Sequence, residues 1–195
     1  MAILQPCALV SPDDLAGRIL YPVGGLAAGE SNDFTEREGG VQLRVAKLAD
    51  AEAISTLINS AFRAAESFLF DRDRINLESV QSLLETGRFL VADDGGVLAG
   101  CVYLERRGEG AYLGLLSVDP HRQKAGVGSK LMKAAEDYCV DTGCRFVELQ
   151  IVNLRRELPD FYRRRGYVVT GTAPFTPGLD PKLPCHFIKM AKSLT

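Results

Sequence analysis

The sequence has few residues of the kinds that bind metal ions. Its five cysteines include no Cys-x-x-Cys pair, and only two histidines, His121 and His186, accompany them. A zinc site needs several such ligands at short, regular spacing, so we expect no metal site. The odd number of cysteines favours reduced thiols, as in a cytoplasm, over a disulfide framework.

Long apolar runs and an excess of positive charge are also missing. No run approaches the roughly 20 apolar residues of a membrane-spanning helix, and no basic residue precedes Arg18, where a secretion signal would need one. The 23 Lys and Arg residues face 25 Asp and Glu residues, for a net charge of −2. A general nucleic-acid binder needs a broad cationic surface. We therefore expect a cytoplasmic protein without a membrane or nucleic-acid partner.

The composition is that of a folded chain, with 46% hydrophobic and 25% charged residues among 195. This length suits one domain with a short appendage. Residues 1–40 contain Pro6, Pro12, Pro22 and the glycine-rich stretch 24–29, which predicts a loosely structured N-terminal leader. The domain itself is expected over residues 41–195.

From Val41 onward, the apolar spacing predicts alternating strands and helices. The expected strands are 41–45, 89–92, 97–104, 111–118, 146–152, 167–170 and 186–192. The expected helices begin at Asp50, cover 77–86 and 129–141, and include a short one from Pro159 to Gly166. Asp93 to Gly96 has the residues of a hairpin turn. The order predicts a mixed α/β (α+β) fold.

The segment from Val118 to Ser129 joins a predicted buried strand to a predicted helix. Gly126 and Gly128 let the main chain approach a ligand closely, and the first N–H groups of the helix have no partner within it. The helix dipole adds partial positive charge, and Arg122 and Lys124 add full charges. This junction is suited to a pyrophosphate group.

The glycines alone do not identify a ligand. Gly126-x-Gly128 lacks the third glycine of a dinucleotide-binding fingerprint, and the segment does not match the Gly-x-x-x-x-Gly-Lys-Ser/Thr phosphate loop. A strand-to-helix turn that binds nothing would also explain them.

The wider pattern is more specific. Gln123-x-x-Gly126-x-Gly128, after Val118-x-Pro120, resembles the acyl-CoA-binding motif of the GNAT N-acetyltransferase superfamily. Asn153 and the run 161–167, Phe-Tyr-Arg-Arg-Arg-Gly-Tyr, resemble the family's segment after the fifth strand. The resemblance covers about residues 41–192. It implies a mixed, mostly antiparallel twisted sheet flanked by helices, with acetyl-CoA as co-substrate.

The resemblance also implies which residues hold acetyl-CoA. The strand that ends at Val118 would diverge from the next at a bulge and pair with the pantetheine arm, while main-chain N–H groups of 123–129 would bind the pyrophosphate. The implied cofactor-binding residues are Leu116, Ser117, Val118, Gln123, Lys124, Ala125, Gly126, Val127, Gly128, Ser129, Asn153 and Tyr162.

The resemblance gives Tyr162 a catalytic role near the thioester sulfur, where its hydroxyl would protonate the departing thiolate. An aromatic ring packed under the sheet is the alternative. The predicted strand 112–117 has no carboxylate to act as a base. Glu105 is the candidate base, with a simply solvated role as its alternative. Glu148 is the other nearby acid and could equally be a surface partner for an arginine. A water chain could remove the proton in place of either.

Two further groups have open roles. Arg163, Arg164 and Arg165 either reach the CoA 3′-phosphate or form a solvated face. A second set lies between the first two predicted helices, where the family builds its acceptor pocket; it comprises Phe62, Glu66, Phe68, Phe70 and Asp71. Its aromatic and acidic character suits an amine, although helix-core packing explains Phe62 equally well.

We therefore expect an acetyltransferase that moves an acetyl group from acetyl-CoA to a primary amine of a small molecule or peptide by direct transfer in a ternary complex. An acyl-CoA-binding regulatory module without turnover is one alternative. A protein-modifying acetyltransferase, acting on lysines or N-termini, is another. The oligomeric state is open, a homodimer included.

Overall fold

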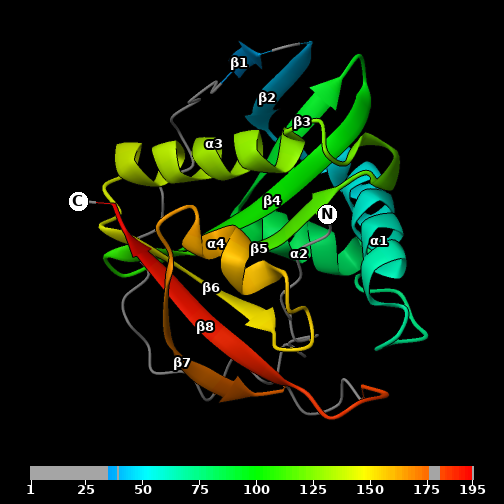
Figure 1. Cartoon of the computed structure of the whole chain (residues 1–195). Helices are drawn as coiled ribbons and strands as arrows, with labels where there is room; N and C mark the ends of the chain where they lie inside the picture. Colours follow the sequence, from blue (N-terminus) through cyan, green and yellow to red (C-terminus); the bar gives the residue numbers. More distant parts are fainter. Residues whose placement is uncertain (1–34, 39, 176–180, 195) are drawn as a thin grey trace.

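A computed structural model describes residues 35–38, 40–175 and 181–194 (Figure 1). The strands are β1 (Thr35–Glu38), β2 (Val41–Val45), β3 (Arg88–Asp94), β4 (Val97–Arg107), β5 (Gly110–Val118), β6 (Phe146–Val152), β7 (Val168–Pro174) and β8 (His186–Ser193). The helices are α1 (Ala51–Glu66), α2 (Leu77–Thr86), α3 (Val127–Asp141) and α4 (Leu158–Arg163), with the short 3-10 helices η2 (Leu48–Asp50) and η3 (Pro120–Arg122).

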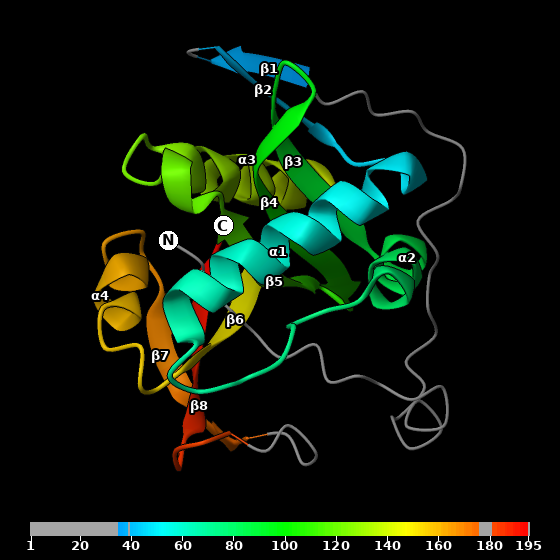
Figure 2. The same ribbon diagram turned by 90° about the vertical axis from the view of Figure 1, so that its right-hand side faces the viewer.

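In the described residues the strands form one sheet, in the order β1-β2-β3-β4-β5-β6-β8-β7. Neighbouring strands run antiparallel except for β5 and β6, which run parallel. Helices α3 and α4 cover one face, and α1 crosses the other beside α2 (Figure 2). The predicted fold class, a mostly antiparallel mixed sheet flanked by helices, is confirmed.

Both faces of the central strands are buried. On one face Leu113 and Leu116 belong to a core with Leu131 of α3, and on the other Tyr112 and Leu115 belong to a core with α1. Every residue of β5 is buried. A strand covered on both faces reads as a continuous apolar run, which is why residues 111–118 were recognisable as a strand without alternation.

The element boundaries differ from the predicted ones at a few points. Helix α2 spans the predicted 77–86. Helix α3 begins at Val127, earlier than predicted, because Gly126 at φ +82° provides the N-cap. Strand β1 pairs with β2 upstream of the predicted domain start at residue 41. The rest of the predicted leader, residues 1–34, lies outside the described residues.

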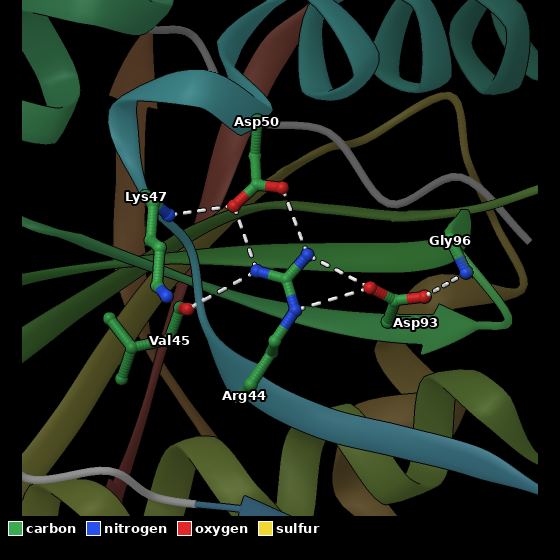
Figure 3. A network of polar contacts seen from close by, with 6 residues as sticks. All are labelled: Arg44, Val45, Lys47, Asp50, Asp93 and Gly96. Carbon is green, nitrogen blue, oxygen red and sulfur yellow. Dashed lines mark hydrogen bonds and ion pairs between the residues drawn. The ribbon is translucent and has the colours of Figure 1, made fainter.

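A network of charged groups holds the first strands to the start of α1 (Figure 3). The guanidinium of Arg44 on β2 donates to both carboxylate oxygens of Asp50, at 2.8 and 2.9 Å, and to Asp93 at 2.9 Å. Asp50 also accepts from the N–H of Lys47, and Asp93 from the N–H of Gly96 in the hairpin turn. The hydrogen bonds that Asp50 accepts, chiefly those from Arg44, lower its pKa.

No helix within the described ranges combines the length and the apolar character needed to cross a lipid bilayer. The same residues contain no cluster of His, Cys, Asp and Glu side chains that is arranged to hold a metal ion.

Replacing Arg44 by methionine should lower the free energy of unfolding by about 2 kcal/mol at pH 7, because two carboxylates lose their charged donor. The folded-state pKa of Asp50 is depressed, so its contribution exists above its unfolded pKa of about 3.9 and is lost as the pH falls. Urea unfolding should therefore show the deficit shrinking below about pH 4.

The matched control is Arg63→Met. Arg63 pairs with Asp73, but both side chains are more than half exposed, so this change should cost less than about 1 kcal/mol. Equal deficits in the two variants, or a pH-independent deficit for Arg44→Met, would contradict the role given to the network.

Candidate functional site

Strands β5 and β6 pair for only a short distance. Their parallel register runs from Gly110 and Phe146 to Tyr112 and Glu148. Beyond these residues β6 continues along β8, and β5 continues along β4. The main chain after Tyr112 thus has no partner strand on its β6 side among the described residues. An open strand edge of this kind can pair with an extended ligand.

A bulge in β5 accompanies this separation. Cys101 of β4 is opposite Ser117, whereas Tyr103 is opposite Gly114, so β5 contains one extra residue. Leu115 within the bulge has φ +51°, a conformation that costs an L-residue on the order of 1–2 kcal/mol. A bulge bends its strand and increases the local twist, which accounts for the divergence from β6.

The hydrogen-bond pattern shows which main-chain groups face the open edge. The N–H of Asp119 donates to the carbonyl of Ala99 at 3.0 Å, so these two residues form a hydrogen-bonded pair. In an antiparallel ladder the neighbouring pair, Val118 and Gly100, is then not hydrogen-bonded. The N–H and C=O of Val118 therefore point away from β4, toward the edge that β6 has left.

The loop after β5 is fixed by its side chains. Asp119 accepts from the N–H of His121 at 2.9 Å and initiates η3. Arg122 forms an ion pair with Asp94 of the β3–β4 hairpin. Arg122 therefore anchors the loop, and its charge is neutralised there. Lys124 is exposed and has φ +69°; with Leu115 it is one of two non-glycine residues in the described chain with positive φ.

The loop leads into a row of unused donors. None of the main-chain N–H groups from Gln123 to Gly128 donates to an acceptor within the described residues, whereas those of Ser129 and Lys130 donate to the carbonyl of Gly126 at 3.0 and 3.1 Å. Left-handed residues followed by a helix start aim successive N–H groups into one concave surface, where the helix dipole adds positive charge. The arrangement suits a diphosphate.

Gly128 leaves room for that group. A Cβ atom at this position would meet one neighbour within 4 Å, Cγ2 of Val118 at 3.5 Å.

Ser117 provides a second sign of a ligand on β5. The residue is 1% exposed, and its hydroxyl has no hydrogen-bond partner in the described structure. Buried hydroxyls are rarely left in this state. The unsatisfied hydroxyl, the free amides and the open strand edge together fit an extended ligand that ends in a diphosphate.

Tyr162 on α4 is buried in the core on the α3 face, with 1% of its surface exposed. Its ring packs edge-on against Phe161 and Tyr167, with centroids 5.2 and 5.4 Å away. Burial raises its pKa well above the ordinary tyrosine value. The hydroxyl is therefore protonated throughout the neutral range and can act only as a proton donor.

Asn153 lies at the end of β6. Its side-chain oxygen accepts from the N–H of His186 at 2.9 Å, and its own N–H donates to the carbonyl of His186 at 3.0 Å. The side-chain oxygen therefore joins β6 to β8, and the NH2 group is the part of Asn153 that a ligand can use.

Both candidate bases, Glu105 and Glu148, contact Arg107 in the part of the sheet where β5 and β6 are still paired. Arg107 contacts Glu105 at 2.7 Å and Glu148 at 3.7 Å. Both acids are strand neighbours of Tyr112. Tyr112 is six residues from Val118, or about 20 Å along an extended strand. Glu105 thus lies in an ion pair, distant from the phosphate end of the site.

Sequence reasoning did not recognise a buried ion pair near this site. Arg155 donates to Glu66 at 3.0 Å and to Glu157 at 2.7 Å. Glu66, Arg155 and Ser117 are the buried polar or charged residues of the described chain. Burial raises the pKa of Glu66, although Arg155 opposes the rise. The signal in the sequence was an acid on the apolar face of α1, one turn after Phe62.

The pair connects two parts of the site. Glu66 ends α1, and Arg155 lies in the turn between Asn153 and Tyr162. The buried contact therefore holds the segment that carries Asn153 and Tyr162 against α1, the helix on the opposite face of the sheet.

The chain matches the model of the Acetyltransferase (GNAT) family over residues 51–167 and belongs to that family. It is an acyl-CoA-dependent acetyltransferase.

Individual relatives agree with this assignment. "Uncharacterized N-acetyltransferase YhfO" of Bacillus subtilis is 29% identical over 142 residues, which are 65% of this chain and 89% of the relative. YncA from Salmonella typhimurium, solved with its cofactor acetyl-CoA, has a TM-score of 0.64 at 19% identity and matches 80% of this chain and 94% of its own. PaiA N-acetyltransferase from Thermoplasma acidophilum, in complex with coenzyme A, has a TM-score of 0.65 at 18% identity and matches 78% and 98%. At these identities the two structures establish the shared fold.

Replacing Arg155 by methionine should cost about 3–5 kcal/mol of unfolding free energy, because the charge of Glu66 is left buried without its partner. The double variant Glu66→Gln/Arg155→Met should recover much of that loss. The deficit of the single variant should also shrink as the pH is lowered, since the pKa of Glu66 is raised and protonation removes the buried charge. Urea unfolding at several pH values measures all three effects.

Arg163→Met serves as the control, because Arg163 pairs with Asp160 where both side chains are more than half exposed. Its cost should stay below about 1 kcal/mol. Additive losses in the double variant would show that Glu66 and Arg155 do not act as a pair.

Proposed function

We propose that the protein transfers an acetyl group from acetyl-CoA to a primary amine of a small molecule or peptide, directly within a ternary complex. The observation that carries this proposal is the row of unused N–H groups from Gln123 to Gly128, next to the open edge of β5. Both features are suited to one extended ligand with a diphosphate at one end.

Each part of the ligand has a proposed set of contacts. The main-chain N–H groups from Gln123 to Gly128 would hold the diphosphate, with Gly126 and Gly128 permitting its approach. The N–H of Ser129, which the sequence analysis grouped with them, already donates to the carbonyl of Gly126. Main-chain groups of Leu116 and Val118, the hydroxyl of Ser117 and the NH2 group of Asn153 would hold the pantetheine arm. When bound, acetyl-CoA supplies an activated thioester carbonyl.

The chain's own residues then assist the transfer. A main-chain N–H on the open edge of β5, near Val118, would stabilise the oxyanion. Tyr162, protonated because of its burial, would give a proton to the thiolate. Glu105 stays the candidate base for the amine. Its ion pair with Arg107 supports a route in which water carries the amine proton out of the site.

The direct test incubates the purified protein with acetyl-CoA and a panel of amines, amino acids and aminoglycosides, and follows thiol release. Release with at least one amine supports the proposal. Calorimetric binding of CoA without release for any amine would favour the regulatory module instead.

Gly128→Ala tests the diphosphate contact. The structure accommodates the new methyl group, and alanine favours a helix over glycine by about 0.5–1 kcal/mol, so stability should be unchanged or higher. The methyl group would occupy the side from which the diphosphate approaches, so CoA affinity should fall about tenfold or more, a loss of at least about 1.4 kcal/mol. Calorimetry with CoA and urea unfolding of the same variant measure both effects. Unchanged affinity would place the diphosphate elsewhere.

Tyr162→Phe tests proton donation. Loss of a general acid should lower kcat about 100-fold or more, while CoA affinity stays within about threefold, a change of less than about 0.7 kcal/mol. Because the pKa of Tyr162 is raised, the wild-type pH–rate profile should show no alkaline limb from this tyrosine. Tyr138→Phe, on the same face near the other end of α3, is the control and should keep its activity. A fall in kcat of only two- or threefold would reject the role.

A further inference from the structure

Arg165 lies directly at the start of α3, although it follows α4 in the chain. One guanidinium nitrogen, Nη2, donates to the hydroxyl of Ser129 at 2.6 Å, and Nη1 donates to the carbonyl of Phe161 at 2.8 Å. The guanidinium also stacks on the ring of Phe161, with Cζ 3.6 Å from its centroid. Ser129 is the third residue of α3, so these contacts hold a full positive charge beside the unused N–H groups.

This position is electrostatically unfavourable for a cation. The start of a helix carries partial positive charge, which repels a guanidinium. No carboxylate lies within ion-pair distance of Arg165 in the described part of the chain. The nearest acid to influence it, Glu136, is seven residues along α3, about 10 Å, and already binds Lys192 at 2.6 Å.

Two other arginines of this region are each paired with a carboxylate. Arg163 binds Asp160 at 2.9 Å, and Arg122 binds Asp94. Burial and the adjacent Arg164 lower the pKa of Arg165, the direction expected of a cation without a compensating anion. The fold thus keeps one guanidinium at the α3 start and leaves its charge uncompensated.

We propose that Arg165 is a direct ligand of the acyl-CoA diphosphate. A dianion at the α3 start would neutralise the guanidinium and accept from the free N–H groups at the same time, and a guanidinium is well shaped for phosphate oxygens. Phe161 and Ser129 orient the group before the ligand arrives, which reduces the entropy lost on binding. The inference rests on the proposed function, because it requires acyl-CoA to bind at this loop.

The experiment measures binding rather than turnover. Calorimetry compares CoA with dephospho-CoA, which keeps the diphosphate but lacks the 3′-phosphate, for wild type, Arg165→Gln, Arg165→Lys and Arg163→Gln. Arg163→Gln removes the same charge two residues away, from an exposed side chain that already has a partner. Urea unfolding of each variant confirms that it is folded.

Arg165→Gln should weaken the binding of both ligands about tenfold or more, as expected for a lost charged contact. Arg165→Lys should recover most of the affinity, because a lysine still supplies the charge. Arg163→Gln should stay within about twofold of wild type, a difference of less than about 0.4 kcal/mol. The loss in Arg165→Gln should also be smaller at high ionic strength.

Three results would overturn the inference. Unchanged affinity in Arg165→Gln would show that the residue does not contact the ligand. A loss seen with CoA but not with dephospho-CoA would assign Arg165 to the 3′-phosphate. An equal loss in Arg165→Lys, with neither loss depending on ionic strength, would show that the charge of this residue does not contribute to binding. Failure of the wild type to bind CoA at all would instead reject the proposed function.

Discussion

Parallel pairing between β5 and β6 ends at Tyr112 and Glu148, and the site depends on this early end. If the two strands stayed paired, the N–H and C=O of Val118 would be used inside the sheet. The bulge at Leu115 bends β5 away and leaves those groups free, while β8 continues to support β6. The sheet thus provides an open edge in its centre, on a strand whose two faces are buried against helices.

The strain at the site is sustained by the packing around it. Leu115 and Lys124 are the two non-glycine residues with positive φ in the described chain, and both adjoin proposed acyl-CoA contacts. Such conformations persist only where the surrounding structure determines them. For Leu115 the support is a strand buried at every residue. For Lys124 it is a loop held by Asp119 and by the ion pair of Arg122 with Asp94.

The distribution of charge follows a consistent pattern. Acids near the site are engaged by basic side chains, as in Glu105 with Arg107 and Glu66 with Arg155. Arg165 and the free main-chain N–H groups remain to receive an anion. In our proposal, the phosphate-rich end of the acetyl donor supplies that anion.

The features that could be predicted from the sequence are those that depend on residues close together in the chain. Helix α2, the Gly95-Gly96 turn and the glycine-rich start of α3 were predicted within a few residues, because periodicity, capping and φ preferences act over short stretches. The assignment of Tyr162 to the site rests on a resemblance in a continuous motif and stays a prediction. The resemblance implied a bulge in β5, but only the tertiary structure located it at Leu115 and showed the partners of the charged groups. Glu66 and Arg155 are 89 residues apart, and Arg165 and Ser129 are 36 apart; such pairs exist only once the sheet and helices have packed, because no local pattern links them.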